Sequence, residues 1–299
     1  MQGRGTLFPS MVIAVSASVW GLYWVPLRLI SEAGVGPAMS VAVFNLPALA
    51  LTAVLFAVRF RQSSGRLKVV AVAGLLAGAG LGSYALGLML IGVVKATMLF
   101  YLTPVWSTLL AMAVLSERPG TGRWVALTIS LVGLALILGV VDTEIEFAFG
   151  VGEACGLGSG LFWAGAAVLM RREEDAPLLG MMLFQYLGVI AFAVIGALFL
   201  TSESVGAIAG LSPIVVGASF IGVISVLTIF WAVGKISPGR SGLLMMTEVV
   251  VAVISAAIFL PEETLTTLQW AGAAMIVAAG IVEVLSTPGT PEEPSPATK

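Results

Sequence analysis

Residues 69–94 read VVAVAGLLAGAGLGSYALGLMLIGVV and contain no charged side chain. The hydrocarbon core of a bilayer is about 30 Å thick, and roughly 20 consecutive apolar residues of α-helix cross it. A transmembrane β-strand is only about ten residues long and alternates apolar with polar positions, which this continuous run does not do. The stretch therefore predicts a transmembrane helix.

Nine further stretches resemble it in length and hydropathy. Each is long enough to cross a bilayer within the usual latitude. One of them, 241–261, is interrupted by a single charged residue, Glu248. The others carry no charge and span 7–27, 35–58, 96–116, 124–141, 154–170, 176–202, 204–234 and 264–282. We predict an all-α integral membrane protein with ten transmembrane helices.

The composition of the 299 residues excludes several other classes of protein. Apolar residues make up 59% of the chain and charged residues 10%, against about a quarter charged in soluble domains. The formal net charge of −2 leaves no basic excess to neutralise a phosphate backbone, which excludes nucleic acid as a partner. With no His and a single cysteine, Cys155, the sequence predicts no metal site, no cofactor and no internal disulfide.

Two features argue against catalysis by this chain. The motif GxxxxGK[ST] is absent, which excludes ATP hydrolysis as the energy source. An intramembrane enzyme acting on lipid or isoprenoid needs clustered His or Asp, or a pair of carboxylates, within its spans, and only Glu248 stands there. We expect a protein that is not an enzyme, and an intramembrane enzyme is the least favoured alternative.

The basic residues of the short connecting segments predict the orientation. If the N-terminus is cytoplasmic, the outer segments hold only Arg28 and Lys95. The cytoplasmic segments then hold 12 basic residues, namely Arg4, Arg59, Arg61, Arg66, Lys68, Arg118, Arg123, Arg171, Arg172, Lys235, Arg240 and Lys299. Such an excess marks the cytoplasmic side, so we predict that both termini lie there.

Weak internal similarity indicates a duplication. With an offset of 143, Ser16, Trp20 and Arg28 align with Ser159, Trp163 and Arg171; with an offset of 144, Thr97, Leu99 and Thr103 align with Ser241, Leu243 and Thr247. Because five spans is an odd number, the second copy must be inverted in the membrane. We predict repeats at 1–142 and 147–285, with a disordered cytoplasmic tail at 286–299. In transporters, inverted repeats place the substrate site near the bilayer midplane.

Four short motifs carry a resemblance to a known family. They are WG at 20–21, ATMLFYLTPVW at 96–106, LSE at 115–117 and LPEETLTTLQWAG at 260–272. Over about residues 7–285 the chain resembles the drug/metabolite transporter superfamily, in particular the ten-helix exporters with two EamA-type repeats, and most closely the aromatic amino-acid exporters among them. One departure is Glu248, where the second repeat of such proteins usually has a proline equivalent to Pro104.

This resemblance implies a carrier of the bacterial inner membrane that moves small metabolites outward. It also implies that the first, third, fourth, sixth, eighth and ninth spans surround a central cavity, while the fifth and tenth lie at the periphery.

Glu248 is the main candidate for a transport role. It lies seven residues into its run and 13 before the end, and an ionisable group at such a depth marks a functional site by default. Its carboxylate is expected to pair with a substrate ammonium or to carry a coupling proton. The alternative is a protonated Glu that is hydrogen-bonded to a neighbouring helix.

Deep aromatic and hydroxyl side chains complete the predicted site. Steps of four and three residues place Thr97, Tyr101 and Pro104 on one helix face. The residues predicted to bind substrate are Trp20, Tyr84, Tyr101, Thr103, Trp163 and Glu248. Candidates for cavity or gating roles are Asn45, Thr97, Pro104, Ser241 and Met245. Packing in the core or against lipid is the alternative for each aromatic ring, and Trp124 and Trp270, near the starts of their spans, are expected to be interfacial anchors.

The sequence thus predicts a secondary transporter that exports aromatic and neutral amino acids, and related metabolites, by alternating access. An exporter of lipophilic cations or drugs and an uncoupled facilitator remain as alternatives. The expected partners are the small-molecule substrate and the lipid bilayer, with proton coupling and the oligomeric state left open.

Overall fold

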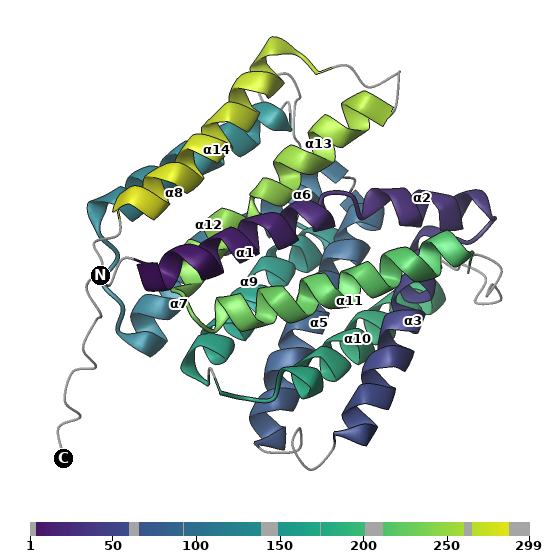
Figure 1. Ribbon diagram of the computed structural model, residues 1–299. Coiled ribbons are helices and arrows are strands. Elements are labelled where there is room, and N and C mark those ends of the chain that lie inside the picture. Colours follow the sequence, from purple (N-terminus) through teal and green to yellow (C-terminus); the bar gives the residue numbers. More distant parts are fainter. Residues whose placement is uncertain are drawn as a thin grey trace.

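The computed structural model describes residues 4–59, 66–91, 93–138, 149–173, 175–200, 212–259 and 265–286, and every regular element within these ranges is helical (Figure 1). The first half of the chain contains α1 (Arg4–Trp20), α2 (Trp24–Glu32), α3 (Pro37–Val58), α5 (Leu67–Ile91), α6 (Val93–Phe100), α7 (Thr103–Leu115) and α8 (Thr121–Ile137). The second half contains α9 (Val151–Arg172), α10 (Leu178–Ile195) with the π-helical turn η1 (Gly196–Leu200), α11 (Pro213–Val233), α12 (Pro238–Met245), α13 (Thr247–Phe259) and α14 (Thr267–Ser286).

Within the described ranges, nine helical segments are long and apolar enough to cross a membrane. A further apolar helix, Thr121–Ile137, has 17 residues. It overlaps the predicted fifth span, whose last residues lie outside the described part of the chain. The predicted tail also lies outside it, except Ser286, which is the last residue of α14. Large apolar side chains such as Val54, Ile214 and Ile258 are exposed on the surface, as expected of a chain surrounded by lipid. These findings agree with the predicted all-α class.

Three of the spans are broken near their middle. The first is interrupted at residues 21–23, the fourth at 101–102 and the ninth at 246. The fourth and ninth resume in equivalent ways, because Thr103 and Pro104 begin α7 as Thr247 and Glu248 begin α13. These are the pairs that the 144-residue offset aligns, so the internal similarity coincides with a shared backbone feature.

Glycines allow the closest helix contacts in the molecule. On α5, a Cβ atom at Gly74 would lie 2.3 Å from the carbonyl oxygen of Met181, and one at Gly78 would lie 2.4 Å from that of Gln185. Real side chains do not tolerate such distances, so α5 and α10 approach each other nearly at backbone contact. The glycine spacing of four residues in 69–94 therefore has a structural role.

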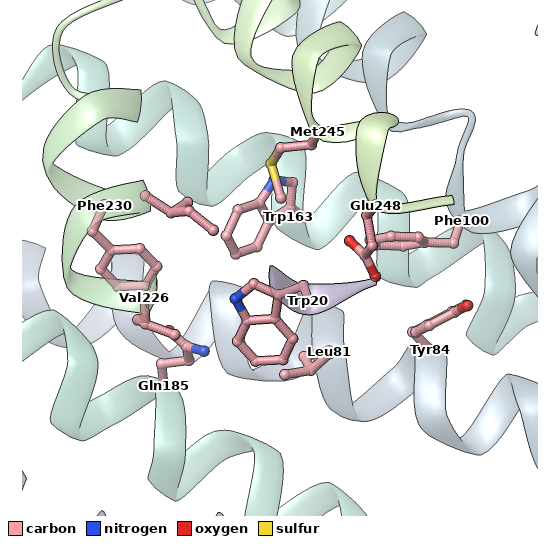
Figure 2. Close-up of a pocket in the computed structure, with 11 residues that line it drawn as sticks. Trp20, Leu81, Tyr84, Phe100, Trp163, Gln185, Val226, Phe230, Met245 and Glu248 are labelled. Atoms are coloured by element: carbon pink, nitrogen blue, oxygen red, sulfur yellow. The ribbon is translucent and has the colours of Figure 1, made fainter. Parts of the chain in front are cut away.

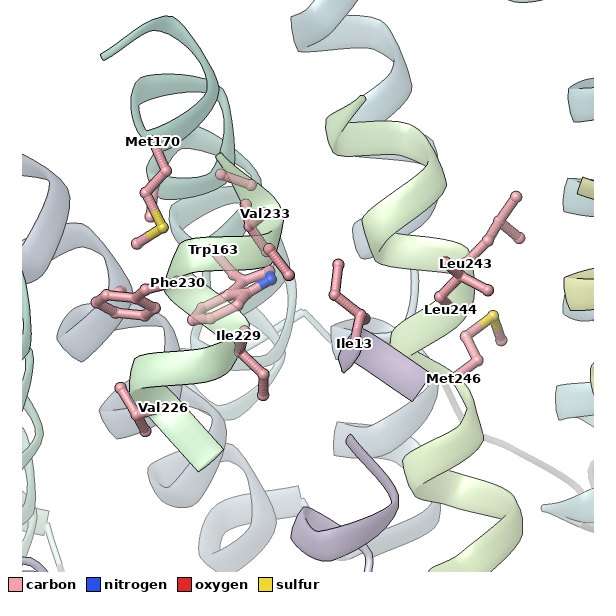
Figure 3. Close-up of a cluster of buried hydrophobic side chains, with 14 of the residues drawn as sticks. Ile13, Trp163, Met170, Val226, Ile229, Phe230, Val233, Leu243, Leu244 and Met246 are labelled. Atoms are coloured by element: carbon pink, nitrogen blue, oxygen red, sulfur yellow. The ribbon is translucent and has the colours of Figure 1, made fainter. Parts of the chain in front are cut away.

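Packing around the two halves is unequal. Helix α5 packs extensively on α9 and α10, whereas α11, its counterpart in the second half, packs more loosely on α1 and α3. The largest buried apolar cluster includes Ile13, Trp163, Phe230 and Leu243, from α1, α9, α11 and α12 (Figure 3). The bundle is therefore firmly joined on the α5 side and less so beside α11.

Helices α8 and α14 form a separate pair at one side of the bundle (Figure 1). A Cβ atom at Gly133 would lie 2.7 Å from the carbonyl oxygen of Gly272, and one at Gly272 would lie 2.5 Å from that of Gly133. Trp124 and Trp270, which begin these helices, are exposed, as interfacial anchors would be. The peripheral position agrees with what the resemblance implied for the fifth and tenth spans.

Candidate functional site

The three broken spans meet at one small cavity of about 50 Å³ (Figure 2). A space of this size holds a few water molecules, so a larger ligand enters only if the walls move. The cavity is lined by Trp20, Leu81, Tyr84, Phe100, Trp163, Gln185, Val226, Ile229, Phe230, Met245 and Glu248. Glu248 is the one charged residue among them, and Gln185 is the one amide.

Glu248 occupies the first turn of α13, where the helix dipole favours a negative charge. Its side chain is half-buried and faces the cavity (Figure 2). Within the described ranges the ion pairs join other residues, so the Glu248 carboxylate has no cationic partner there. A carboxylate at this depth without a counter-ion is suited to a cationic ligand.

The break in the first span lies directly against Glu248. A Cβ atom at Gly21 would lie 2.6 Å from the backbone oxygen of Glu248 and 2.8 Å from the Cβ atom of Val251. Only glycine permits this approach of the two backbones. The hinge between α1 and α2 is thereby in contact with the turn that carries the carboxylate.

Aromatic rings form most of the remaining wall. Tyr84 stacks on Phe100 with ring centroids 4.6 Å apart. The ring centroids of Trp163 and Phe230 are 6.2 Å apart. The ring centroids of Trp20 and Tyr23 are 5.1 Å apart, and Tyr23 is not among the residues that line the cavity. Such faces attract organic cations through their quadrupoles, and stack well on other flat rings.

The structure brings five of the predicted residues together at the cavity, namely Trp20, Tyr84, Trp163, Met245 and Glu248. Thr97 lies behind this wall, where its hydroxyl is 3.0 Å from that of Tyr84 and orients the phenol. These six residues come from α1, α5, α6, α9, α12 and α13.

The other predicted residues of the fourth span lie beside the cavity and are not in its lining. Tyr101 is buried and packs edge-on against Phe100 at 4.9 Å. Thr103 donates a hydrogen bond to the carbonyl oxygen of Phe100, and Pro104 contacts α12 at Gly242. The assumption of one continuous helical face from Thr97 to Pro104 is wrong, because the helix is interrupted at residues 101–102.

Asn45 and Ser241 also lie outside the lining. The Asn45 amide donates to the Val41 carbonyl at 2.8 Å and to the Tyr23 hydroxyl at 3.3 Å. The Ser241 hydroxyl donates to the Pro238 carbonyl at 2.8 Å. Asn45 therefore positions Tyr23, and Ser241 stabilises the start of α12.

Sequence reasoning missed Gln185. It is buried on α10 and lines the cavity. The available signal was a single amide within the neutral run 176–202, because an amide in a membrane span needs a polar partner. Phe100 and Phe230 were also missed, since nothing in the sequence separates a lining Phe from a packing one.

A second cavity of about 350 Å³ shares Trp20 with the first as a lining residue. Its walls come from residues 19–26, Phe44 on α3, Ala218 to Gly222 on α11 and Phe259 at the end of α13. The walls are almost entirely apolar. We call this space the vestibule.

A compact ion-pair network joins both halves of the chain, and none of its residues is in the cavity lining. Arg123 Nε donates to Glu283 at 3.1 Å, and Arg123 Nη1 donates to the Ser237 hydroxyl at 2.8 Å. Glu117 accepts a hydrogen bond from Ser237 at 2.5 Å and lies 3.5 Å from Arg123. All four residues belong to segments whose predicted location is the cytoplasmic face.

Among the described residues, no group of three His, Cys, Asp or Glu side chains is close enough to hold a metal ion. For ligand binding, the residues that line the cavity offer one carboxylate, one amide and several aromatic faces.

Comparison with known proteins finds the same family pattern in both halves of the chain. The sequence pattern of the EamA-like transporter family matches twice, at residues 7–139 and 150–284. One solved crystal structure superposes with a TM-score of 0.71 at 18% sequence identity, covering 93% of this chain and 96% of its own. No curated protein matches the sequence.

Proposed function

Since the chain belongs to the EamA-like transporter family, we propose that it is a secondary transporter that exports aromatic and neutral amino acids and related small metabolites across the bacterial inner membrane. The observation that carries this proposal is Glu248, a carboxylate that has no cationic partner among the described residues and that lines an aromatic cavity. In this proposal the ammonium group of the substrate pairs with Glu248, and the apolar side chain of the substrate lies between Trp20 and Trp163.

Several features of the backbone support a transport mechanism by alternating access. Substrate sites of secondary transporters are commonly built where spanning helices are discontinuous. Here three discontinuous spans meet at the cavity, and the Gly21 hinge contacts the Glu248 turn. A cation that draws the carboxylate toward itself would move α13 and, through Gly21, the join of α1 and α2.

Two features of the described residues support a resting state that is closed toward the cytoplasm. The Arg123 network ties the predicted cytoplasmic ends of both halves together. The vestibule lies among residues whose predicted location is the outer half of the membrane. In this proposal, Trp20 separates the occluded site from the outward path.

A second candidate function is export of lipophilic cations. It is favoured by the absence of Lys and Arg from the described residues that line the cavity, because an amino-acid carboxylate would have no cationic partner among them. Coupling to protons through Glu248 applies to either substrate class, and an uncoupled facilitator is the remaining variant of the same site.

The test is uptake of radiolabelled phenylalanine by proteoliposomes containing wild type or Glu248→Gln, with and without a proton gradient. We expect saturable uptake by wild type and its loss in Glu248→Gln. Glu32→Gln is the matched control, because Glu32 forms an exposed pair with Arg28 on α2 and should transport normally.

Further arms separate the alternatives. Wild-type uptake of tetraphenylphosphonium without uptake of phenylalanine would replace the amino-acid assignment by the lipophilic-cation one. Counterflow of phenylalanine without any response to the proton gradient would identify a facilitator. Retention of full activity by Glu248→Gln would contradict the role of the carboxylate.

A further inference from the structure

Gln185 is a buried amide in a membrane-spanning helix. Its side chain is 2% exposed, and its Oε1 atom makes no hydrogen bond among the described residues. Apart from Tyr186, the other residues of α10 are apolar or glycine. An unpaired amide in such surroundings is unfavourable, and native structures seldom retain one without a functional reason.

Gln185 and Glu248 line the same cavity. Figure 2 shows the Trp20 ring between them, with the Glu248 carboxylate on one side and Gln185 on the other. The indole nitrogen of Trp20 lies on the side of the ring that faces Gln185 (Figure 2). The cavity thus has an anionic end at Glu248 and a neutral hydrogen-bonding end at Gln185, with the Trp20 ring between them.

Taking the proposed function as given, we infer that Gln185 selects substrates that carry a second hydrogen-bonding group across an apolar body from the ammonium. An α-amino acid holds its ammonium and carboxylate on one carbon atom, so these two groups cannot reach both ends of the cavity. A phenol hydroxyl stands across the ring from the ammonium group, and in this inference it pairs with Gln185 once the walls, Trp20 among them, have moved apart to admit the ligand. The preferred class is aromatic amino acids and amines with a distal hydroxyl, such as tyrosine.

Energetic reasoning predicts strong discrimination by such a residue. A site that hydrogen-bonds a substrate hydroxyl disfavours the analogue without it, because the buried polar group of the protein then stays unpaired. A site lined only by apolar groups would instead disfavour the hydroxylated member of the pair. A preference for the hydroxylated substrate therefore indicates a hydrogen bond from the substrate to Gln185, and the opposite preference indicates a purely apolar site.

The experiment compares two substrate pairs that differ by one hydroxyl. Tyrosine against phenylalanine and tyramine against phenethylamine are each measured as kcat/KM in proteoliposomes of wild type and Gln185→Leu. Wild type should prefer the hydroxylated member of each pair that it transports. In Gln185→Leu this preference should fall by about tenfold or more, through a higher KM for the hydroxylated member alone.

Two further variants control for folding and for the loss of an amide. Gln185→Met keeps the length of the side chain and should behave as Gln185→Leu does. Gln269→Leu removes an amide from peripheral α14, where Gln269 Nε2 donates to the Ile137 carbonyl at 3.1 Å, and should leave both ratios unchanged. Size-exclusion chromatography confirms that each variant is monodisperse before reconstitution.

The outcomes separate this inference from the proposed function. Equal kcat/KM within a pair in wild type, or a preference that survives both Gln185 variants, would overturn the inference and leave the transporter assignment intact. Transport of the amines alone would overturn the amino-acid assignment, and the tyramine ratio would still decide the role of Gln185. Transport of none of the four compounds would overturn both.

Discussion

The backbone oxygen of Glu248 lies 2.6 Å from the position that a Cβ atom on Gly21 would occupy. Gly21→Ala therefore forces the hinge of the first span away from α13. We expect transport to slow at least about tenfold and the free energy of unfolding to fall by about 1–3 kcal/mol, the usual effect of overpacking. Proteoliposome uptake and thermal unfolding measure the two effects.

Gly217→Ala is the control for this substitution, because nothing lies within 4 Å of the Cβ position at Gly217. It should leave both quantities unchanged. A Gly21→Ala protein with wild-type uptake would show that the close contact with Glu248 is not needed for transport.

The ring of Trp163 is predicted to contribute to binding through its face. Trp163→Phe keeps an aromatic face and should change KM less than about threefold, whereas Trp163→Leu should raise KM about tenfold, as expected for a cation–π contact worth roughly 1–2 kcal/mol. Trp231→Leu is the comparison, since Trp231 lies exposed on α11. Equal KM values for Trp163→Leu and wild type would assign Trp163 to packing alone.

The reciprocal contact of Gly133 and Gly272 should stabilise the α8–α14 pair without affecting the site. In Gly272→Ala the new Cβ atom meets the Gly133 oxygen at 2.5 Å, so we expect a loss of about 1–3 kcal/mol in unfolding free energy. KM should stay unchanged, because neither helix lines the cavity. Gly280→Ala, whose Cβ would meet its nearest neighbour at 3.8 Å, should unfold as wild type does. A changed KM would contradict this separation.

The Arg123–Glu283 pair is expected to stabilise the protein more than an exposed pair does. The Glu283 side chain is 1% exposed and that of Arg123 11%, so Glu283→Gln should lower the free energy of unfolding by about 1.5–3 kcal/mol. Glu32→Gln breaks the exposed Arg28 pair and should cost less than about 1 kcal/mol. Equal losses in chemical unfolding of the two variants would argue against a stabilising network.

The spans and the deep carboxylate were predictable from sequence, and the breaks were not. Hydropathy identifies helices because every backbone group in lipid must be paired within its own segment, and Glu248 interrupts such a run visibly. A break at residues 101–102 depends on contacts with other helices. It turns Thr103 against Gly160 on α9 and so removes it from the face that the helical spacing predicted.

Gln185 illustrates the second limit. An amide is unusual in the neutral run 176–202. The direction in which the Gln185 side chain leaves α10, however, is set by the contact of α10 with Gly78 on α5. Which side of a helix faces a cavity depends on packing across the whole bundle, and the hydropathy of one helix does not contain that information. The five predicted residues that do line the cavity were found through depth in the membrane and through alignment of the two halves.

The Arg123 network also has a consequence for biosynthesis. Arg123 and Glu283 are 160 residues apart in the chain, and α14 is the last helix of the described chain. While the ribosome is still producing the second half, α8 already stands in the membrane with its glycine face uncovered and its arginine without this partner. The contact of the two glycine faces and the Arg123–Glu283 pair therefore form only after α14 has been made, and a chain that stops before α14 has neither.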